Sequence, residues 1–144
     1  MNSTDRVTTA KIDTIEVTEE RHVARARHEA LTLGRMSGMR NISIHAFATI
    51  ISELAYNLVF HTDQGGTIKI RTLKDGERNG IEVICEDPGP GIEDTELALQ
   101  DGYSTGGGLG GGLPGVRRLA NEFEITSTPG VGTRIRALRW DLVK

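Results

Sequence analysis

One stretch of the sequence has a composition suited to binding phosphate, namely Ser104 to Arg118 (STGGGLGGGLPGVRR). Seven of the protein's 18 glycines lie within it, between Gly106 and Gly115. Glycine lets a backbone approach a ligand closely, and Pro114 suits the first turn of a helix. A glycine loop that leads into a helix offers free N–H groups and a partial positive charge, which favour phosphate. The alternative is a flexible linker between two domains, but only 26 residues follow Arg118, too few for a second ordinary domain.

Two further groups of polar residues stand at the edges of apolar segments. Glu53 and Asn57 lie four positions apart, so on a helix they share a face about one turn apart. Asp87 ends the alternating segment GIEVICED, and Gly89 and Gly91 follow it and bring backbone close to whatever Asp87 contacts. Each group has an ordinary alternative: a helix-boundary pair in the first case and a Pro-Gly turn after a strand in the second. Neither group identifies a site alone.

The elements that must position these groups follow from hydrophobic periodicity. A helix is predicted over residues 42–60, with an apolar stripe made by Phe47, Ile51, Leu54 and Leu58. A capped helix is expected to begin after Thr18 and to end near Gly34 or Gly38. Further helices are expected over 93–100 and 115–123, and strands over 8–17, 66–73, 80–87, 124–127 and 133–140. Without strict βαβ alternation, this order predicts an α+β two-layer sandwich, in which a mixed, mostly antiparallel sheet carries helices on one face.

Composition limits the classes of function. A length of 144 residues predicts a single domain over residues 1–144 with its own core. A net charge of −3 indicates neither disorder nor a nucleic-acid footprint. Cys85 is the only cysteine, so no intramolecular disulfide forms and a buried side chain is expected. No secretion signal or membrane-spanning apolar stretch is recognised, and we expect a soluble, cytoplasmic protein. A solvated sheet face is expected for the late arginines, Arg117, Arg118, Arg134, Arg136 and Arg139.

The order of the motifs resembles that of the GHKL ATPases, which include gyrase, the Hsp90 chaperone, MutL and histidine kinases. ISELAYN resembles their N box, EDPGPGI their G1 box and GGLGGGL their G2 box. Within this superfamily the chain is similar to the small bacterial serine-protein kinases of sigma-factor partner switching, and most of all to the RsbT-type switch kinases of the stressosome. DGYSTGGGLGGGLPGVRRL and GVGTRIRA also carry this resemblance, which covers nearly the whole chain from about Thr8.

The resemblance implies roles at the matching positions. Glu53 would be the general base that draws the proton from an acceptor hydroxyl, and Asn57 would ligate Mg²⁺. Asp87 would accept a hydrogen bond from the amino group of adenine, in a pocket shaped by Gly89 and Gly91. An ATP lid over residues 101–113 would supply the other nucleotide contacts, from Ser104, Thr105, Gly106, Gly107, Gly108, Leu109, Gly110, Gly111, Gly112 and Leu113.

The function implied by the resemblance is an ATP- and Mg²⁺-dependent serine/threonine protein kinase of a bacterial stress response. It would phosphorylate a STAS-domain partner and then activate a PP2C-type phosphatase, without contact to nucleic acid or membrane. Ser52 stands where histidine kinases carry histidine, which argues against that class. One alternative is an anti-sigma factor kinase that sequesters an RNA polymerase sigma subunit. Another is an adaptor that binds nucleotide without transferring phosphate, although such an adaptor would not need Glu53.

Overall fold

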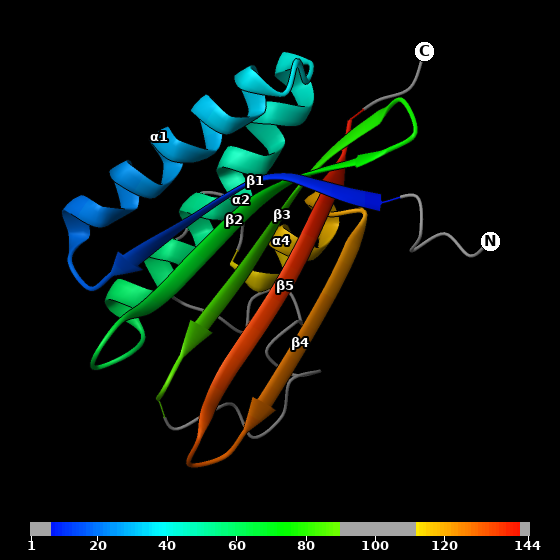
Figure 1. Ribbon diagram of the computed structural model, residues 1–144. Coiled ribbons are helices and arrows are strands. Elements are labelled where there is room, and N and C mark those ends of the chain that lie inside the picture. Colours follow the sequence, from blue (N-terminus) through cyan, green and yellow to red (C-terminus); the bar gives the residue numbers. More distant parts are fainter. Residues whose placement is uncertain (1–6, 90–111, 142–144) are drawn as a thin grey trace.

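The computed structural model describes residues 7–89 and 112–141, in which a five-stranded sheet carries helices on one face (Figure 1). The strands are β1 (Val7–Val17), β2 (Gly66–Asp75), β3 (Arg78–Asp87), β4 (Glu122–Thr128) and β5 (Gly132–Trp140). The helices are α1 (Glu20–Met36), α2 (Asn41–Phe60) and α4 (Leu113–Leu119). The strand order is β1-β2-β3-β5-β4, and each of these neighbouring pairs is antiparallel. The expected α+β sandwich is therefore confirmed.

One predicted boundary is wrong, because the helix after the glycine stretch ends at Leu119 and not near Phe123. Phe123 lies in β4 instead. Two hydrogen bonds of Asn121 fix the chain between the end of α4 and the start of β4. Its backbone N–H donates to the Leu138 carbonyl at 2.7 Å, and its side-chain oxygen accepts the N–H of Trp140 at 2.7 Å. Contacts with a strand that comes later in the chain thus stop the helix.

Helix α2 lies at the centre of the core, because α1, α4 and the sheet all pack against it. Its predicted apolar stripe is buried, with each side chain at most 2% exposed: Phe47, Ile51, Leu54 and Leu58. By length and composition α2 is also apolar enough to cross a membrane, which contradicts the sequence-based expectation that no segment would be. Core helices pass the same test, and 61% of this apolar window is buried inside the fold. The apolar residues of α2 are thus used in packing.

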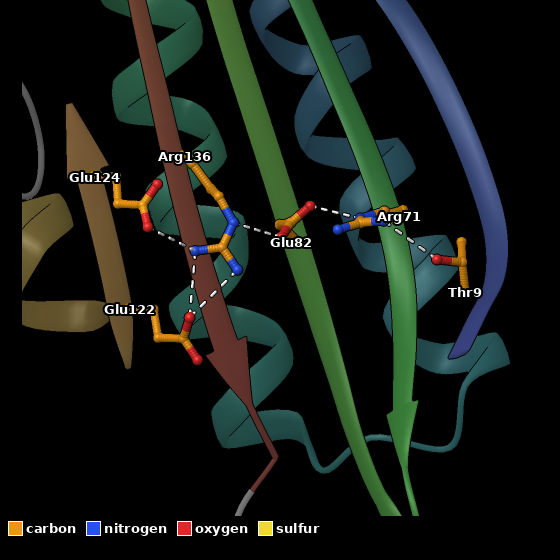
Figure 2. Close-up of polar contacts among 6 residues, drawn as sticks. All are labelled: Thr9, Arg71, Glu82, Glu122, Glu124 and Arg136. Carbon is orange, nitrogen blue, oxygen red and sulfur yellow. Dashed lines mark hydrogen bonds and ion pairs between the residues drawn. The ribbon is translucent and has the colours of Figure 1, made fainter. Parts of the chain in front are cut away.

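The sheet face away from the helices carries an ionic network. Figure 2 shows that it reaches across all five strands through Thr9, Arg71, Glu82, Arg136, Glu122 and Glu124. Its centre is Glu82 of β3, whose side chain is fully buried. Arg71 Nε donates to Glu82 Oε1 at 2.5 Å, and Arg136 Nε donates to Oε2 at 2.7 Å. One buried carboxylate therefore joins β2, β3 and β5.

Arg136 differs from the expectation of a solvated arginine, because its side chain is only 19% exposed. Burial lowers the pKa of Arg136, but its hydrogen bonds to Glu82 and Glu122 and their charges outweigh burial and raise the pKa above its ordinary value. Arg139 departs from the expectation in another way: it donates through Nη1 to the carbonyl oxygen of Leu119, at the end of α4, at 2.9 Å. Arg134 is the exposed arginine of this strand.

Replacing Glu82 with alanine is expected to lower the free energy of unfolding by about 2 kcal/mol, measured by urea denaturation. The substitution removes the shared carboxylate and leaves Arg136 half-buried, with only exposed partners. The matched control is Glu122→Ala at the 51% exposed end of the network, which should cost less than about 0.5 kcal/mol. Equal losses in the two variants would contradict the central position of Glu82.

A second prediction concerns pH. Glu29 of α1 has a raised pKa, chiefly through a side-chain hydrogen bond with Asp13 of β1, then through burial and the charge of Asp13. The folded state binds this proton more tightly than the unfolded chain, so stability falls as pH rises from the ordinary value of 4.5 through the raised pKa. Glu29→Gln should therefore raise the thermal midpoint at about pH 7 and lose this advantage below about pH 4. Thermal unfolding at both pH values tests this, and an advantage that is equal at the two would refute it.

Candidate functional site

Glu53 lies on α2, and its side chain contacts the residue that precedes α4. Its side chain is 2% exposed, and its Oε2 accepts the backbone N–H of Gly112 at 3.2 Å. Gly112 has a φ of 69°, a left-handed conformation that glycine adopts readily, and it stands at the N-cap of α4. The contact ties the end of the glycine-rich stretch to α2. Two residues that the sequence assigns to one site are therefore brought together.

Asn57 is half-buried and lies one helical turn beyond Glu53 on α2. The following residue, Leu58, packs against the start of β2: a Cβ added at Gly66 would lie 2.8 Å from the Leu58 side chain and 2.1 Å from the Glu86 carbonyl oxygen. The last turns of α2 thus lie against the ends of β2 and β3.

Among residues 7–89 and 112–141, no cluster of three or more His, Cys, Asp or Glu side chains could hold a metal ion. A hard cation here would take the Asn57 side-chain oxygen together with oxygens of a ligand.

Asp87 ends β3 on the side of the sheet that the helices cover, the side it shares with Val83 and Cys85. Its Oδ1 accepts the backbone N–H of Gly89 at 2.8 Å. A Cβ added at Gly89 would lie 2.7 Å from this oxygen, so the turn is closer than an ordinary side chain allows. The turn therefore orients the carboxylate by one oxygen, while Oδ2 has no partner among the described residues.

Cys85 is buried, as expected from the sequence. Burial, with the charges of Asp87 and Glu86, raises the pKa of the Cys85 thiol well above its ordinary value. The thiolate needed for nucleophilic chemistry is therefore disfavoured, and Cys85 serves as a core residue.

Thr133 of β5 stands beside Asp87, although the sequence analysis did not single it out. The β3–β5 pairing sets the two residues directly opposite each other. Thr133 is 8% exposed and faces the helices, as Ile135 and Ala137 do on the same strand. The alternation of these three residues indicates their common face. Only the register of β5 against β3, which the sequence does not contain, puts Thr133 next to Asp87.

The end of the sheet around Asp87 is hollowed. A cavity of about 490 Å³ is lined mainly by residues of the face away from the helices, including Thr67, Glu86, Thr126 and Arg134, and Asp87 and Thr133 also border it. A second cavity of about 260 Å³ lies on the other side of the turn after β3, next to the α2–β2 connection. Of these two cavities in the described residues, neither is lined by Glu53 or Asn57. Glu53 and Asn57 therefore lie outside the linings of both cavities.

The other predicted site residues fall into two groups. Leu113 is described, is 8% exposed and packs into the core. Outside the described residues lie the helix expected over 93–100 and the site residues Gly91, Ser104, Thr105, Gly106, Gly107, Gly108, Leu109, Gly110 and Gly111.

The family of histidine kinase-, DNA gyrase B- and HSP90-like ATPases matches residues 43–144 of this chain. The chain belongs to this family, the GHKL ATPases. The match begins in α2 and includes Glu53, Asn57 and Asp87, so the family assignment rests on the part of the chain that forms the candidate site.

Curated relatives place this GHKL chain more narrowly. It is 38% identical over 126 residues to the serine/threonine-protein kinase RsbT of Bacillus subtilis (strain 168), covering 88% of this chain and 94% of that protein. It is 35% identical over 97 residues to the anti-sigma F factor of Thermoanaerobacter sp. (strain X514), covering 64% of this chain and 66% of that protein. The resemblance to RsbT-type kinases is thus confirmed, and the chain carries an RsbT-like, kinase-type ATPase domain.

A solved structure has the same fold as this GHKL chain. It is the crystal structure of the RsbU and RsbW domains of a Mycobacterium tuberculosis protein, with a TM-score of 0.61 at 16% identity. The similarity covers 94% of this chain and 34% of that longer one. It supports the GHKL fold alone.

Proposed function

We propose that this GHKL chain is an ATP- and Mg²⁺-dependent serine/threonine protein kinase of a bacterial partner-switching pathway. The observation that carries the proposal is the buried Glu53, one turn before Asn57 and hydrogen-bonded to Gly112 at the end of the glycine stretch. A domain that only bound nucleotide would not need a buried carboxylate at this point. The identity to the kinase RsbT supports the same reaction.

Recognition of the nucleotide base is assigned to Asp87 and Thr133. Gly89 fixes Asp87 Oδ1, so Oδ2 is the carboxylate oxygen that would accept a hydrogen bond from the adenine amino group. Thr133 stands directly opposite on β5 and adds a second polar atom. The backbone at Gly132 passes so close to Asp87 that an added Cβ would lie 2.1 Å from the Asp87 carbonyl oxygen, so glycine is needed at this position.

We assign phosphoryl transfer to α2 and to residues 101–113, which we propose as the ATP lid. Mg²⁺, when bound, would neutralise charge on the transferred group, and the side-chain oxygen of Asn57 would hold it. Glu53 would take the proton from the acceptor hydroxyl as that oxygen bonds to the γ-phosphorus and the bond to ADP breaks. Since Glu53 is 2% exposed, its surroundings exclude bulk water that would compete as the acceptor.

The partners belong to the proposal too. We expect a serine or threonine of a STAS-domain protein to receive the phosphoryl group in the cytoplasm, after which the freed kinase activates a PP2C-type phosphatase. The test incubates the purified chain with ATP, Mg²⁺ and a STAS-domain protein from the same genome, followed by mass spectrometry of that protein. One added phosphoryl group on Ser or Thr is the expected result. An unmodified partner, with ATP bound by the kinase, would contradict the proposed transfer.

A second candidate function is sequestration of an RNA polymerase sigma subunit by an anti-sigma factor kinase. The observation in its favour is the 35% identity to anti-sigma F factors. Affinity capture from cell extract with ATP separates the two functions. Capture of a sigma subunit, in place of STAS proteins and a phosphatase, would favour the anti-sigma function over the proposed partner-switching kinase.

A further inference from the structure

The edge strand β1 is the longest strand of the sheet in the described part of the chain, and there it pairs only with β2. It has 11 residues, against 7 in β4 at the other edge. About half of its backbone N–H and C=O groups therefore point away from the sheet. Edge strands are usually short, bulged or charged, which limits pairing with other chains. β1 has one bulge, between Thr9 and Lys11, and pairs regularly from Lys11 to Val17.

The side chains at the start of this regular segment have a self-complementary order. Asp13 lies on the helix-covered face, because β2 sets it opposite the core residue Ile70, and Lys11 shares that face. Ile12 lies between them on the open face, opposite Arg71, and is 49% exposed. The order along the edge is thus positive, apolar, negative. A second copy that runs antiparallel presents negative, apolar, positive.

We propose that two copies of this chain associate through β1, antiparallel and with the two-fold axis at Ile12. The two Ile12 side chains would meet on the open face, and each Lys11 would lie opposite Asp13 of the other copy. Directly opposite Cβ atoms are about 4.5–5.5 Å apart, close enough for an ion pair between such side chains. The two five-stranded sheets would then form one continuous sheet.

The charges on β1 disfavour the neighbouring registers. A two-fold axis at Lys11 would set two lysines opposite each other, and an axis at Asp13 would do the same with two carboxylates. Like charges directly opposite each other destabilise a sheet. An axis between two residues would place side chains of opposite faces across from each other. Of these arrangements, only the axis at Ile12 joins opposite charges.

A second acid, Glu29 of α1, adds negative charge beside Asp13. A side-chain hydrogen bond with Asp13, then burial and the charge of Asp13, raise the pKa of Glu29, although the charges of Lys11 and His28 act to lower it. Within one copy, positive charge therefore does not fully offset the two carboxylates. The second copy's Lys11 would bring another cation to this point.

The position of α1 allows this pairing. Helix α1 packs over both β1 and β2. The two copies of α1 would therefore lie about two strand spacings apart, about 10 Å, which is an ordinary distance between packed helices.

The test measures the dissociation constant of the dimer by sedimentation equilibrium of the full chain. The wild-type chain is expected to form a concentration-dependent dimer. Lys11→Asp and Asp13→Lys each make both contacts across the axis like-charged, so each should raise the dissociation constant at least about tenfold. The control Glu16→Lys makes the same charge change as Asp13→Lys, but on the open face and farther from the axis. It should change the constant less than about threefold.

Mixing the two weakened variants tests the register itself. Between one Lys11→Asp chain and one Asp13→Lys chain, both contacts again join opposite charges. The mixture should therefore form a heterodimer with a dissociation constant within about threefold of the wild-type value. A chain that carries both substitutions should recover its homodimer for the same reason.

Thermal unfolding shows whether each variant is folded. If Asp13→Lys does not fold, Ile12→Cys takes its place, because the two introduced thiols would meet at the axis. An intermolecular disulfide is then expected on mild oxidation. Wild-type chain, whose single cysteine is the buried Cys85, should form none.

A wild-type chain that stays monomeric at every concentration would overturn the inference, as would a dimer that neither charge substitution weakens. A mixture that forms no heterodimer would contradict the register. If the chain were monomeric and Lys11→Asp weakened binding of a STAS-domain protein, the edge would belong to that partner and not to a second copy. These outcomes leave the proposed kinase intact, because Asp87 and Thr133 belong to β3 and β5, away from this edge.

Discussion

Glu53→Gln is expected to lower the rate of phosphoryl transfer to the protein partner about 10³-fold while changing the dissociation constant of ATP less than about twofold. Glutamine has the shape of glutamate but cannot take a proton from the acceptor hydroxyl. It still offers an oxygen to the Gly112 N–H, which lies 3.2 Å from the carboxylate in the wild-type chain. The site geometry is therefore kept and the base alone is removed.

Single-turnover transfer of labelled phosphate measures this rate, and calorimetry measures the ATP affinity of the same sample. A suitable control is Glu77→Gln in the exposed turn between β2 and β3, which should change neither quantity. Transfer by Glu53→Gln at more than about a tenth of the wild-type rate would show that another group is the base.

Asp87→Asn is expected to raise the dissociation constant of ATP at least about 100-fold. The asparagine oxygen can accept the N–H of Gly89, which donates to Oδ1 at 2.8 Å in the wild-type chain, so the turn is preserved. The amide then presents its NH₂ group where the carboxylate had an acceptor. A donor facing the amino group of adenine leaves both groups without a partner.

The matched control for this substitution is Glu86→Gln, one position earlier on β3 and facing the opposite side of the sheet. It removes the same charge near the cavity but should leave ATP affinity within about twofold. If Glu86→Gln weakened binding as much as Asp87→Asn, the effect would come from net charge near the cavity and not from recognition of the base.

Much of the fold could be predicted because its elements have clear local periods. The stripe from Phe47 to Leu58 has helical spacing, and α2 buries those residues. The end of α4 could not be predicted in this way. Asn121 stops that helix through bonds to Leu138 and Trp140, which belong to a strand much later in the sequence. Such contacts depend on tertiary structure and leave no local pattern.

The same distinction applies to the site. Glu53, Asn57 and Asp87 were found because their spacing and neighbours form recognisable motifs. Thr133 was missed because a lone threonine in an alternating strand is ordinary, and its place beside Asp87 depends on strand register. Glu82 also looks like a solvent-facing residue of a strand. It is buried because β2 and β5 each bring an arginine to it (Figure 2).

The central claim is that one end of the helix-covered sheet face binds ATP for phosphoryl transfer. Amide NMR spectra recorded while ATP and Mg²⁺ are added to the uniformly labelled chain test this claim most directly. The largest shifts are expected at Asn57, Asp87, Gly112 and Thr133, with little change at Arg71 and Glu82 on the open face of the sheet. No shifts at saturating ATP, or shifts confined to that open face, would contradict the claim.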